Sequence, residues 1–181
     1  MNIFQHRIDS ATFIASPNHD QRPDPEDISL LVIHCISLPP EQFGGDYVDR
    51  LFCNCLPQDD HPYFREIHHL RVSAHLLIRR DGTLAQFVPF DQRAWHAGLS
   101  QFQGRERCND FSIGIELEGS VNQAFAEQQY NSLIEVSSLL ISHYPRLQPQ
   151  TIVGHSDIAP GRKDDPGPFF DWPRYRSALN R

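Results

Sequence analysis

The sequence predicts a single α+β domain of the α/β-sandwich type, and three stretches of the chain carry that prediction. The apolar run at 28–35 is typical of a buried central strand. Two β-rich segments within 72–88 flank Asp81-Gly82, a pair that favours a tight hairpin. Residues 127–144 repeat apolar side chains at helical spacing. A chain of 181 residues is long enough to enclose these elements around one hydrophobic core.

The remaining elements are shorter. Residues 1–27 are polar and rich in proline, and we expect them to form an extended arm over the domain. Pro173 suits the first turn of a last helix, which should begin near Phe170. The other predictions are two short helices and two strands, at 46–54, 63–70, 111–119 and 151–153.

Composition excludes several classes of function. The net charge of −7 disfavours general binding to nucleic acid or to an anionic membrane, because both require a basic face. No run of about 18 apolar residues predicts a membrane span. The first residues lack the features of a signal peptide, so we expect a cytoplasmic protein. Four cysteines at unpatterned spacings are expected to be free thiols: Cys35, Cys53, Cys55 and Cys108.

A segment rich in glycine and proline at 153–168 holds the densest group of reactive side chains. It contains His155, Lys163 and Asp165, and the surrounding glycines and prolines favour a fixed loop without helix or sheet. Such a loop is either an active site or an ornate surface loop. His155 and Asp165 are competent metal ligands, so the rest of the chain must supply a third.

His34 ends the predicted central strand and is a candidate for that third ligand. The alternative is a core histidine whose ring is satisfied by a backbone carbonyl. Neighbouring side chains on a strand point to opposite faces, so His34 and Cys35 should not both reach one metal ion.

Glu116 lies on the predicted strand at 111–119. Alternation places Ser112, Gly114, Glu116 and Glu118 on one face, and the two small residues would leave space for a ligand. A carboxylate in such a place can act as a general base. The alternative is a solvent-facing edge of the sheet.

Two further segments have equally open interpretations. Trp95 and His96 are flanked by small residues and form either the wall of a binding site or an ordinary loop anchor. The basic residues Arg105 and Arg107 suit an anionic substrate group or a solvated loop. His75, within the first hairpin strand, is expected to have a packing role.

Two histidines and one carboxylate from separate segments fit a catalytic zinc that keeps its fourth position open for water. A structural zinc would be closed by thiolates. Cys53 and Cys55 are the available pair, but C-x-C on a short helix aims the two side chains apart. The residues therefore favour metal catalysis.

Six blocks of the sequence resemble the cytoplasmic zinc amidases that act on anhydromuropeptides. These enzymes belong to the N-acetylmuramoyl-L-alanine amidase family, together with phage lysozyme-type amidases and peptidoglycan recognition proteins. The similarity runs from about residue 15 to about residue 175. The blocks are Leu31–His34, Arg71–His75, Arg93–Gly98, Gln103–Asp110, Phe111–Gly119 and Gly154–Pro168.

The resemblance implies one zinc amidase domain over 1–181, built on a central mixed β-sheet flanked by helices. It implies one Zn²⁺ per chain on His34, His155 and Asp165, with Glu116 and Lys163 as the catalytic pair. The substrate contacts that it implies are Tyr47, Arg71, Ala94, Trp95 and Arg107.

The function implied is hydrolysis of the amide between the lactyl group of (1,6-anhydro-)N-acetylmuramic acid and L-alanine of the stem peptide. This reaction belongs to cytoplasmic peptidoglycan recycling and limits the muropeptide signals that induce β-lactamase. The expected partner is a small muropeptide, with no nucleic acid or membrane, and the expected state is a monomer. A non-catalytic muropeptide sensor is the main alternative, and a secreted amidase acting on intact wall is disfavoured by the absence of a signal peptide.

The sequence departs from the family pattern at two positions. Cys35 follows the first histidine where the family has an asparagine, so a substrate contact is in doubt there. Asp164 precedes Asp165, and the ligand is assigned to Asp165 because that residue stands in the Asp-Pro-Gly motif.

Overall fold

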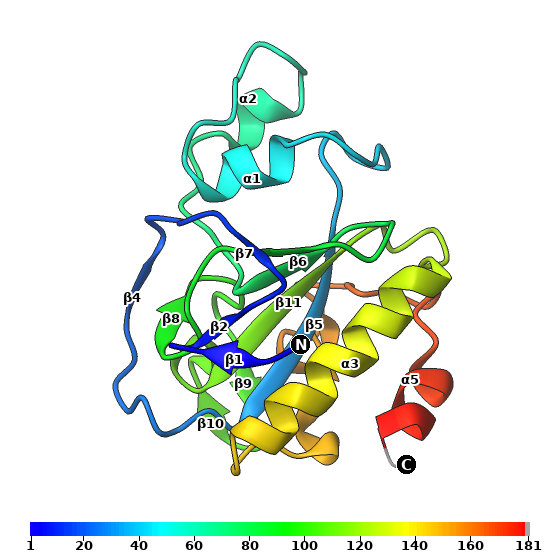
Figure 1. The fold of residues 1–181 in the computed structure, drawn as a ribbon. Coiled ribbons are helices and arrows are strands. Elements are labelled where there is room, and N and C mark those ends of the chain that lie inside the picture. Colours follow the sequence, from blue (N-terminus) through cyan, green and yellow to red (C-terminus); the bar gives the residue numbers. More distant parts are fainter. Residues whose placement is uncertain (180–181) are drawn as a thin grey trace.

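A computed structural model describes residues 1–179 and places a six-stranded mixed β-sheet at the centre of the molecule (Figure 1). The strand order is β12-β5-β11-β6-β7-β3, in which the first four strands run parallel and β7 runs antiparallel to β6. The predicted fold class is therefore confirmed. The strands are β3 (Thr12–Phe13), β5 (Leu30–Ile36), β6 (Leu76–Ile78), β7 (Leu84–Gln86), β11 (Ser112–Glu118) and β12 (Ile152–Gly154).

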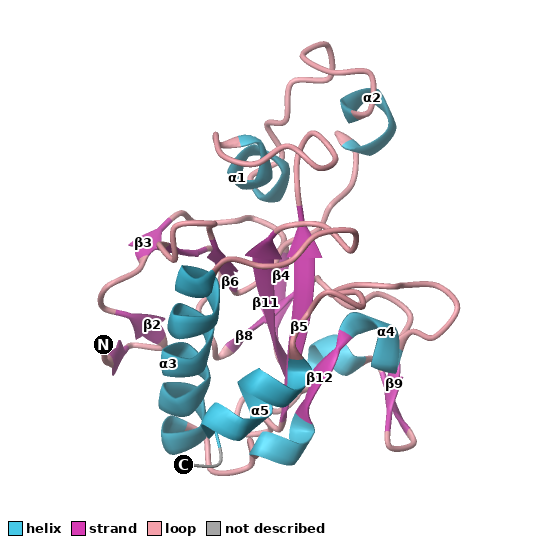
Figure 2. Cartoon of the chain, turned by 90° about the vertical axis from the view of Figure 1, so that its right-hand side faces the viewer, coloured by secondary structure: helices cyan, strands magenta, loops and turns pink. Residues whose placement is uncertain are grey.

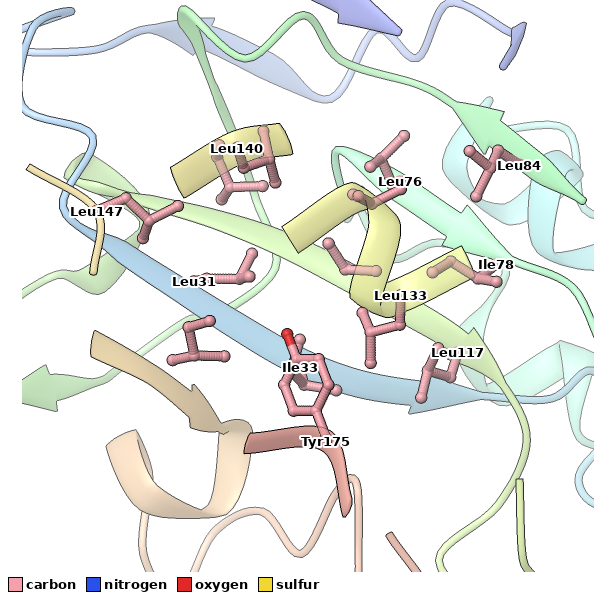
Figure 3. Packing of buried hydrophobic residues seen from close by; sticks show 14 of the residues in the cluster. Leu31, Ile33, Leu76, Ile78, Leu84, Leu117, Leu133, Leu140, Leu147 and Tyr175 are labelled. Carbon is pink, nitrogen blue, oxygen red and sulfur yellow. The ribbon is translucent and has the colours of Figure 1, made fainter. Parts of the chain in front are cut away.

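One face of the sheet is covered by α3 (Glu127–His143) and α5 (Trp172–Leu179) (Figure 2). Leu31 and Ile33 of β5 pack with Leu133 of α3 and Tyr175 of α5 in the main core (Figure 3). Each such buried aliphatic side chain stabilises the fold by about 1.5–3 kcal/mol. This apolar layer fixes the two central strands from one side.

The opposite face of β5 and β11 carries His34 and Glu116. Leu30 and Val32 are buried there in a smaller cluster with Ile158 of α4 (His155–Ile158). The two strands are parallel and paired in register, so their carboxyl ends meet at one edge, where His34 lies beside Glu116. Ligand sites of open sheets with parallel strands form at such carboxyl ends.

Two short helices, α1 (Tyr47–Phe52) and α2 (Phe64–Ile67), lie together beyond the carboxyl end of β5 (Figure 1). Both were predicted from sequence, and both are shorter than predicted. Phe52 and Phe64 are buried in a second apolar cluster with Phe87. This cluster attaches the helical segment to the sheet, close to the edge that carries His34.

The amino-terminal arm is built into the domain by β-pairing. It contains the hairpin of β1 (Ile3–Phe4) and β2 (Arg7–Ile8), the edge strand β3, and β4 (His19–Gln21), which pairs with β8 (Gln92–Ala94). The buried guanidinium of Arg22 donates hydrogen bonds to four backbone carbonyls, those of Phe90, Asn109, Asp110 and Ser112.

The hairpin around Asp81-Gly82 is confirmed as β6 and β7. Sequence reasoning missed a second hairpin, formed by β9 (Gln101–Phe102) and β10 (Arg105–Glu106), whose turn is Gln103-Gly104. Two 3₁₀ turns complete the fold, at Cys108–Asp110 and Pro149–Thr151. Within residues 1–179, no helix is long and apolar enough to cross a membrane.

Candidate metal centre and active site

Three candidate ligand atoms converge at the carboxyl end of β5. His34 Nδ1 lies 3.0 Å from His155 Nδ1 and 3.1 Å from Asp165 Oδ2, and the latter two atoms are 3.2 Å apart. Ligand atoms around a tetrahedral zinc with bonds of about 2.0–2.1 Å are about 3.3 Å apart. These three residues form the one group of metal-ligand type found within residues 1–179.

Local structure explains how His155 and Asp165 meet. The segment predicted as a loop without helix contains the helical turn α4, which begins at His155 and buries Ile158, so that prediction was wrong for residues 155–158. The Ser156 amide donates to the Asp165 carbonyl at 3.0 Å and closes the loop. A Cβ atom on Gly154 would lie 2.8 Å from Pro166 Cδ, so only glycine allows this close approach.

The electrostatics of the cluster favour a neutral His34 imidazole beside an ionised Asp165 carboxylate. Burial lowers the pKa of His34 to about 4. Burial also opposes ionisation of Asp165, but the adjacent imidazoles of His155 and His34 outweigh it and hold the pKa of Asp165 below its usual range. A divalent metal requires histidine ligands that are neutral and a carboxylate ligand that is ionised.

Glu116 lies next to this cluster on β11. Its Oε2 atom is buried and finds no hydrogen-bond partner among residues 1–179. Burial raises the pKa of Glu116 well above the ordinary value; the charge of Asp165 adds to the shift and that of Lys163 opposes it. A carboxylate oxygen that is buried without a partner is costly in a fold, so Glu116 is a candidate functional group.

The cluster opens into a cavity of about 550 Å³. Glu116, Lys163 and the three candidate ligands line one side of it. Apolar residues from the α1–α2 segment form another wall, among them Leu51, Tyr63 and Ile67.

The predicted substrate contacts are distributed unevenly around this cavity. Trp95 lines it, whereas Ala94 is fully buried. Tyr47 bonds Asp60 through its hydroxyl group and packs on Phe64. Arg71 is exposed and donates to the carbonyls of His69 and Leu70, close to cavity residue Leu70. Arg107 borders a second cavity. Their roles as substrate contacts stay predictions.

Several sequence alternatives are now resolved. His34 bonds other ring nitrogens and a carboxylate, so the core histidine satisfied by a backbone carbonyl is wrong. β11 is an inner strand, so the solvent-facing edge is wrong. The expected ligand space over Gly114 is filled by the ring of His96, a contact that sequence reasoning missed.

The cysteines lie outside the ligand cluster. Cys35 follows His34 and packs partly against the core on the α3 side, although it also borders the cavity. Burial, with Glu116 and Asp165 nearby, raises the pKa of its thiol. Cys53 Sγ faces the Ala15 carbonyl at 3.8 Å, and Cys55 is exposed.

A buried His-His-Asp cluster, an enclosed carboxylate and a lysine at the mouth of a cavity define a hydrolase whose site can hold a metal ion. The family model described as N-acetylmuramoyl-L-alanine amidase matches residues 24–168. The chain therefore belongs to the N-acetylmuramoyl-L-alanine amidase family and is an amidase.

Relatives of known name support this membership. The chain is 60% identical to the 1,6-anhydro-N-acetylmuramyl-L-alanine amidase AmpD of Haemophilus influenzae, over 92% of this chain and 90% of that protein. It is 57% identical to AmpD of Escherichia coli K12, over 100% of this chain and 98% of that protein. A crystal structure of a selenomethionine AmpD derivative superposes with a TM-score of 0.95 at 54% identity, covering 98% of this chain and 99% of that one.

A more distant structure carries a ligand. The N-acetylmuramyl-L-alanine amidase AmiD of Escherichia coli, in complex with the substrate anhydro-N-acetylmuramic acid-L-Ala-D-γ-Glu-L-Lys, matches with a TM-score of 0.61 at 30% identity. The match covers 95% of this chain and 60% of AmiD.

Proposed function

We propose that this chain is a zinc-dependent amidase that cuts the bond between the lactyl group of 1,6-anhydro-N-acetylmuramic acid and L-alanine of the stem peptide. The AmpD relatives carry this activity in their names at 57–60% identity. The AmiD structure holds a substrate of the same class. A muropeptide of this kind is the proposed partner, and peptidoglycan recycling is the proposed process.

The observation that carries the proposal is the convergence of His34 Nδ1, His155 Nδ1 and Asp165 Oδ2 beside the unpaired Glu116 carboxylate. Two imidazoles and one carboxylate suit zinc, whereas an all-oxygen ligand set would suit magnesium or calcium. A pure binding module would have no use for an enclosed base beside these ligands. The site therefore favours a hydrolase over a muropeptide sensor.

The donor set and the orphaned Glu116 oxygen both fit a zinc ion, which His34, His155 and Asp165 would hold. When bound there, zinc would supply a positive charge to polarise the scissile carbonyl and would lower the pKa of the attacking water. The protein contributes a neutral imidazole ligand at His34, because burial keeps the pKa of that ring low.

Glu116 is the proposed general base. Its raised pKa suits a group that first takes a proton from the attacking water and then passes it to the departing amine of alanine. Lys163 lines the same cavity, and we assign its cation the role of stabilising the oxyanion that develops on the carbonyl oxygen. One such donor typically contributes about 10²–10³ in rate.

The cavity offers different surfaces for the two ends of the substrate. Trp95 and the apolar residues Tyr63 and Ile67 suit the faces of a sugar or the aliphatic parts of the peptide. Arg71 and Arg107 are proposed to meet peptide carboxylates, and Tyr47 and Ala94 to complete the substrate contacts.

We further propose that the enzyme works as a monomer in the cytoplasm. A single chain assembles all three candidate ligands and the base. Its four cysteines are free thiols in the structure, as a reducing compartment requires.

Product analysis tests the bond that is cut. The enzyme is incubated with anhydro-N-acetylmuramyl tripeptide, and the products are identified by mass spectrometry. The expected products are the free anhydro sugar acid and an intact tripeptide with L-alanine at its amino terminus. Cleavage inside the peptide, with the first alanine still attached to the sugar, would contradict the proposal. The reducing-end muropeptide, run in parallel, measures the preference for the anhydro sugar.

A further inference from the structure

Within the segment Trp95–Gly98, His96 and Ala97 contact the ring nitrogens of the candidate histidine ligands that point away from the cluster. His34 Nε2 is 2.9 Å from His96 Nδ1, and His155 Nε2 is 3.2 Å from the backbone carbonyl of Ala97. Each ligand histidine therefore directs one ring nitrogen to the cluster and the other to this segment. Such partners of ligand histidines set the tautomer and the orientation of the ring.

The hydrogen bonds determine which ring nitrogen of each of these histidines carries a proton. The Ala97 carbonyl can only accept, so His155 carries a proton on Nε2, and as a metal ligand it would present the Nδ1 lone pair to the cluster. If His34 Nδ1 is also a ligand, His34 Nε2 must donate to His96 Nδ1. His96 then carries its proton on Nε2, where Ser112 Oγ lies 3.1 Å away and accepts it.

Neighbouring residues are fitted to hold His96 in this position. The Asn109 side-chain oxygen accepts hydrogen bonds from the backbone amides of His96 and Ala97, at 3.2 and 2.8 Å. A Cβ atom on Gly114 would lie 2.5–2.7 Å from atoms of the His96 ring, so the absence of a side chain at Gly114 makes room for it. The rings of His34 and His96 meet edge to face, with centroids 5.0 Å apart.

We propose that His96 is a positioning residue for the metal site. Its Nδ1 accepts a hydrogen bond from the Nε2–H of His34 and thereby fixes the tautomer that presents His34 Nδ1 to the metal. The inference rests on the proposed metal site. It does not require His96 to touch metal or substrate. It also explains two neighbours of His96: Gly114 makes room for its ring, and Ser112 Oγ accepts the hydrogen bond from its Nε2–H.

Two substitutions of His96 separate hydrogen bonding from packing. His96→Asn keeps an acceptor oxygen close to the position of Nδ1, so it can still receive the His34 proton. His96→Gln places its amide close to the position of Nε2, so it keeps the Ser112 contact and loses the His34 contact. Loss of a group that orients a ligand typically lowers metal affinity about 10–100-fold.

The experiment measures the zinc dissociation constant of each folded, metal-free variant by competition with a chromogenic chelator. We expect His96→Gln to bind zinc about 10–100-fold more weakly than the wild type and His96→Asn to stay within a few-fold. Gly114→Ala, which leaves His96 in the chain but displaces its ring, should weaken binding as His96→Gln does. Long-range ¹H–¹⁵N spectra of the zinc-loaded wild type should place the His34 proton on Nε2.

His75→Asn is the matched control. His75 is a fully buried histidine whose ring centroid lies 5.8 Å from that of His96, and its Nδ1 accepts the Gly114 amide, a bond that asparagine can keep. Its zinc affinity should equal that of the wild type. Unchanged affinity in His96→Gln would overturn the proposal, as would equal losses in His96→Asn, His96→Gln and His75→Asn. Zinc binding without hydrolysis in the wild type would contradict the proposed function and leave this inference standing.

Discussion

Glu116 on β11 is paired in register with His34 on β5. The two strands are parallel neighbours, so both side chains leave the sheet on the same face and at the same level. Strand pairing alone thus places the proposed base beside a proposed ligand. The apolar side chains on the other face of these strands pack under α3 and keep the pair fixed.

Replacing Glu116 by glutamine should leave metal binding intact and remove most of the activity. The amide has nearly the shape of the carboxylate but cannot take a proton from water. A positioned general base typically contributes about 10²–10⁴ in rate, so we expect kcat to fall by that factor. Metal content by elemental analysis and kcat on an anhydromuropeptide check this. Turnover at the wild-type rate would show that Glu116 is not the base.

The metal-free protein should lose stability as the pH falls below about 6.5. Burial lowers the pKa of His34, His75 and His96 in the fold, so the unfolded chain, with histidine pKa near 6.5, binds protons that the fold does not. Each such proton adds a slope of about 1.4 kcal/mol per pH unit. The free energy of unfolding in urea should therefore rise from pH 5 to pH 6.5.

Glu116 should oppose that slope. Its pKa is raised by burial, so its contribution to stability is fully present below about pH 4.5 and is lost as the pH rises through the folded-state pKa. Glu116→Gln removes this opposing contribution, so stability of the variant should rise more steeply between pH 5 and pH 6.5. Equal slopes for the two proteins would argue against a protonated Glu116 in the metal-free fold.

Arg22→Lys tests whether the amino-terminal arm is part of the fold. The guanidinium donates to four backbone carbonyls in a buried position, and an ammonium group cannot match that planar set of donors. We expect a loss of about 2–4 kcal/mol in the free energy of unfolding. Arg65→Lys, at an exposed position of α2, should change it by less than about 0.5 kcal/mol. Similar small effects of both substitutions would mean that the arm contributes little.

The sequence predicted the elements whose signals are local and periodic. Alternation on 111–119 assigned Glu116 to the correct face, and the apolar run ending at His34 marked the central strand. The long helix at 127–144 matches α3 to within a residue. These features follow from side-chain periods that any packed sheet or helix must satisfy.

Other features depend on contacts that sequence periodicity does not express. His96 occupies the space over Gly114 because a loop from β8 folds across the sheet. The second hairpin had a usable signal in the sequence, namely Gly104. In the structure Gln103 and Gly104 form a two-residue turn in which both residues have positive φ, a conformation that glycine favours. The helical turn at His155 was not predicted, because the glycines and prolines around it are typical of a loop. The prediction that His34, His155 and Asp165 act together rested mainly on family resemblance, because these residues meet only in the tertiary structure.

The central claim is that hydrolysis depends on one zinc ion held by His34, His155 and Asp165. The most direct test titrates chelator-treated, metal-free protein with Zn²⁺ and follows release of the stem peptide from an anhydromuropeptide. The account predicts no hydrolysis at the start, a linear rise on addition of zinc, and saturation at one equivalent per chain. Full hydrolysis by the metal-free protein, or none when one zinc is bound, would contradict it.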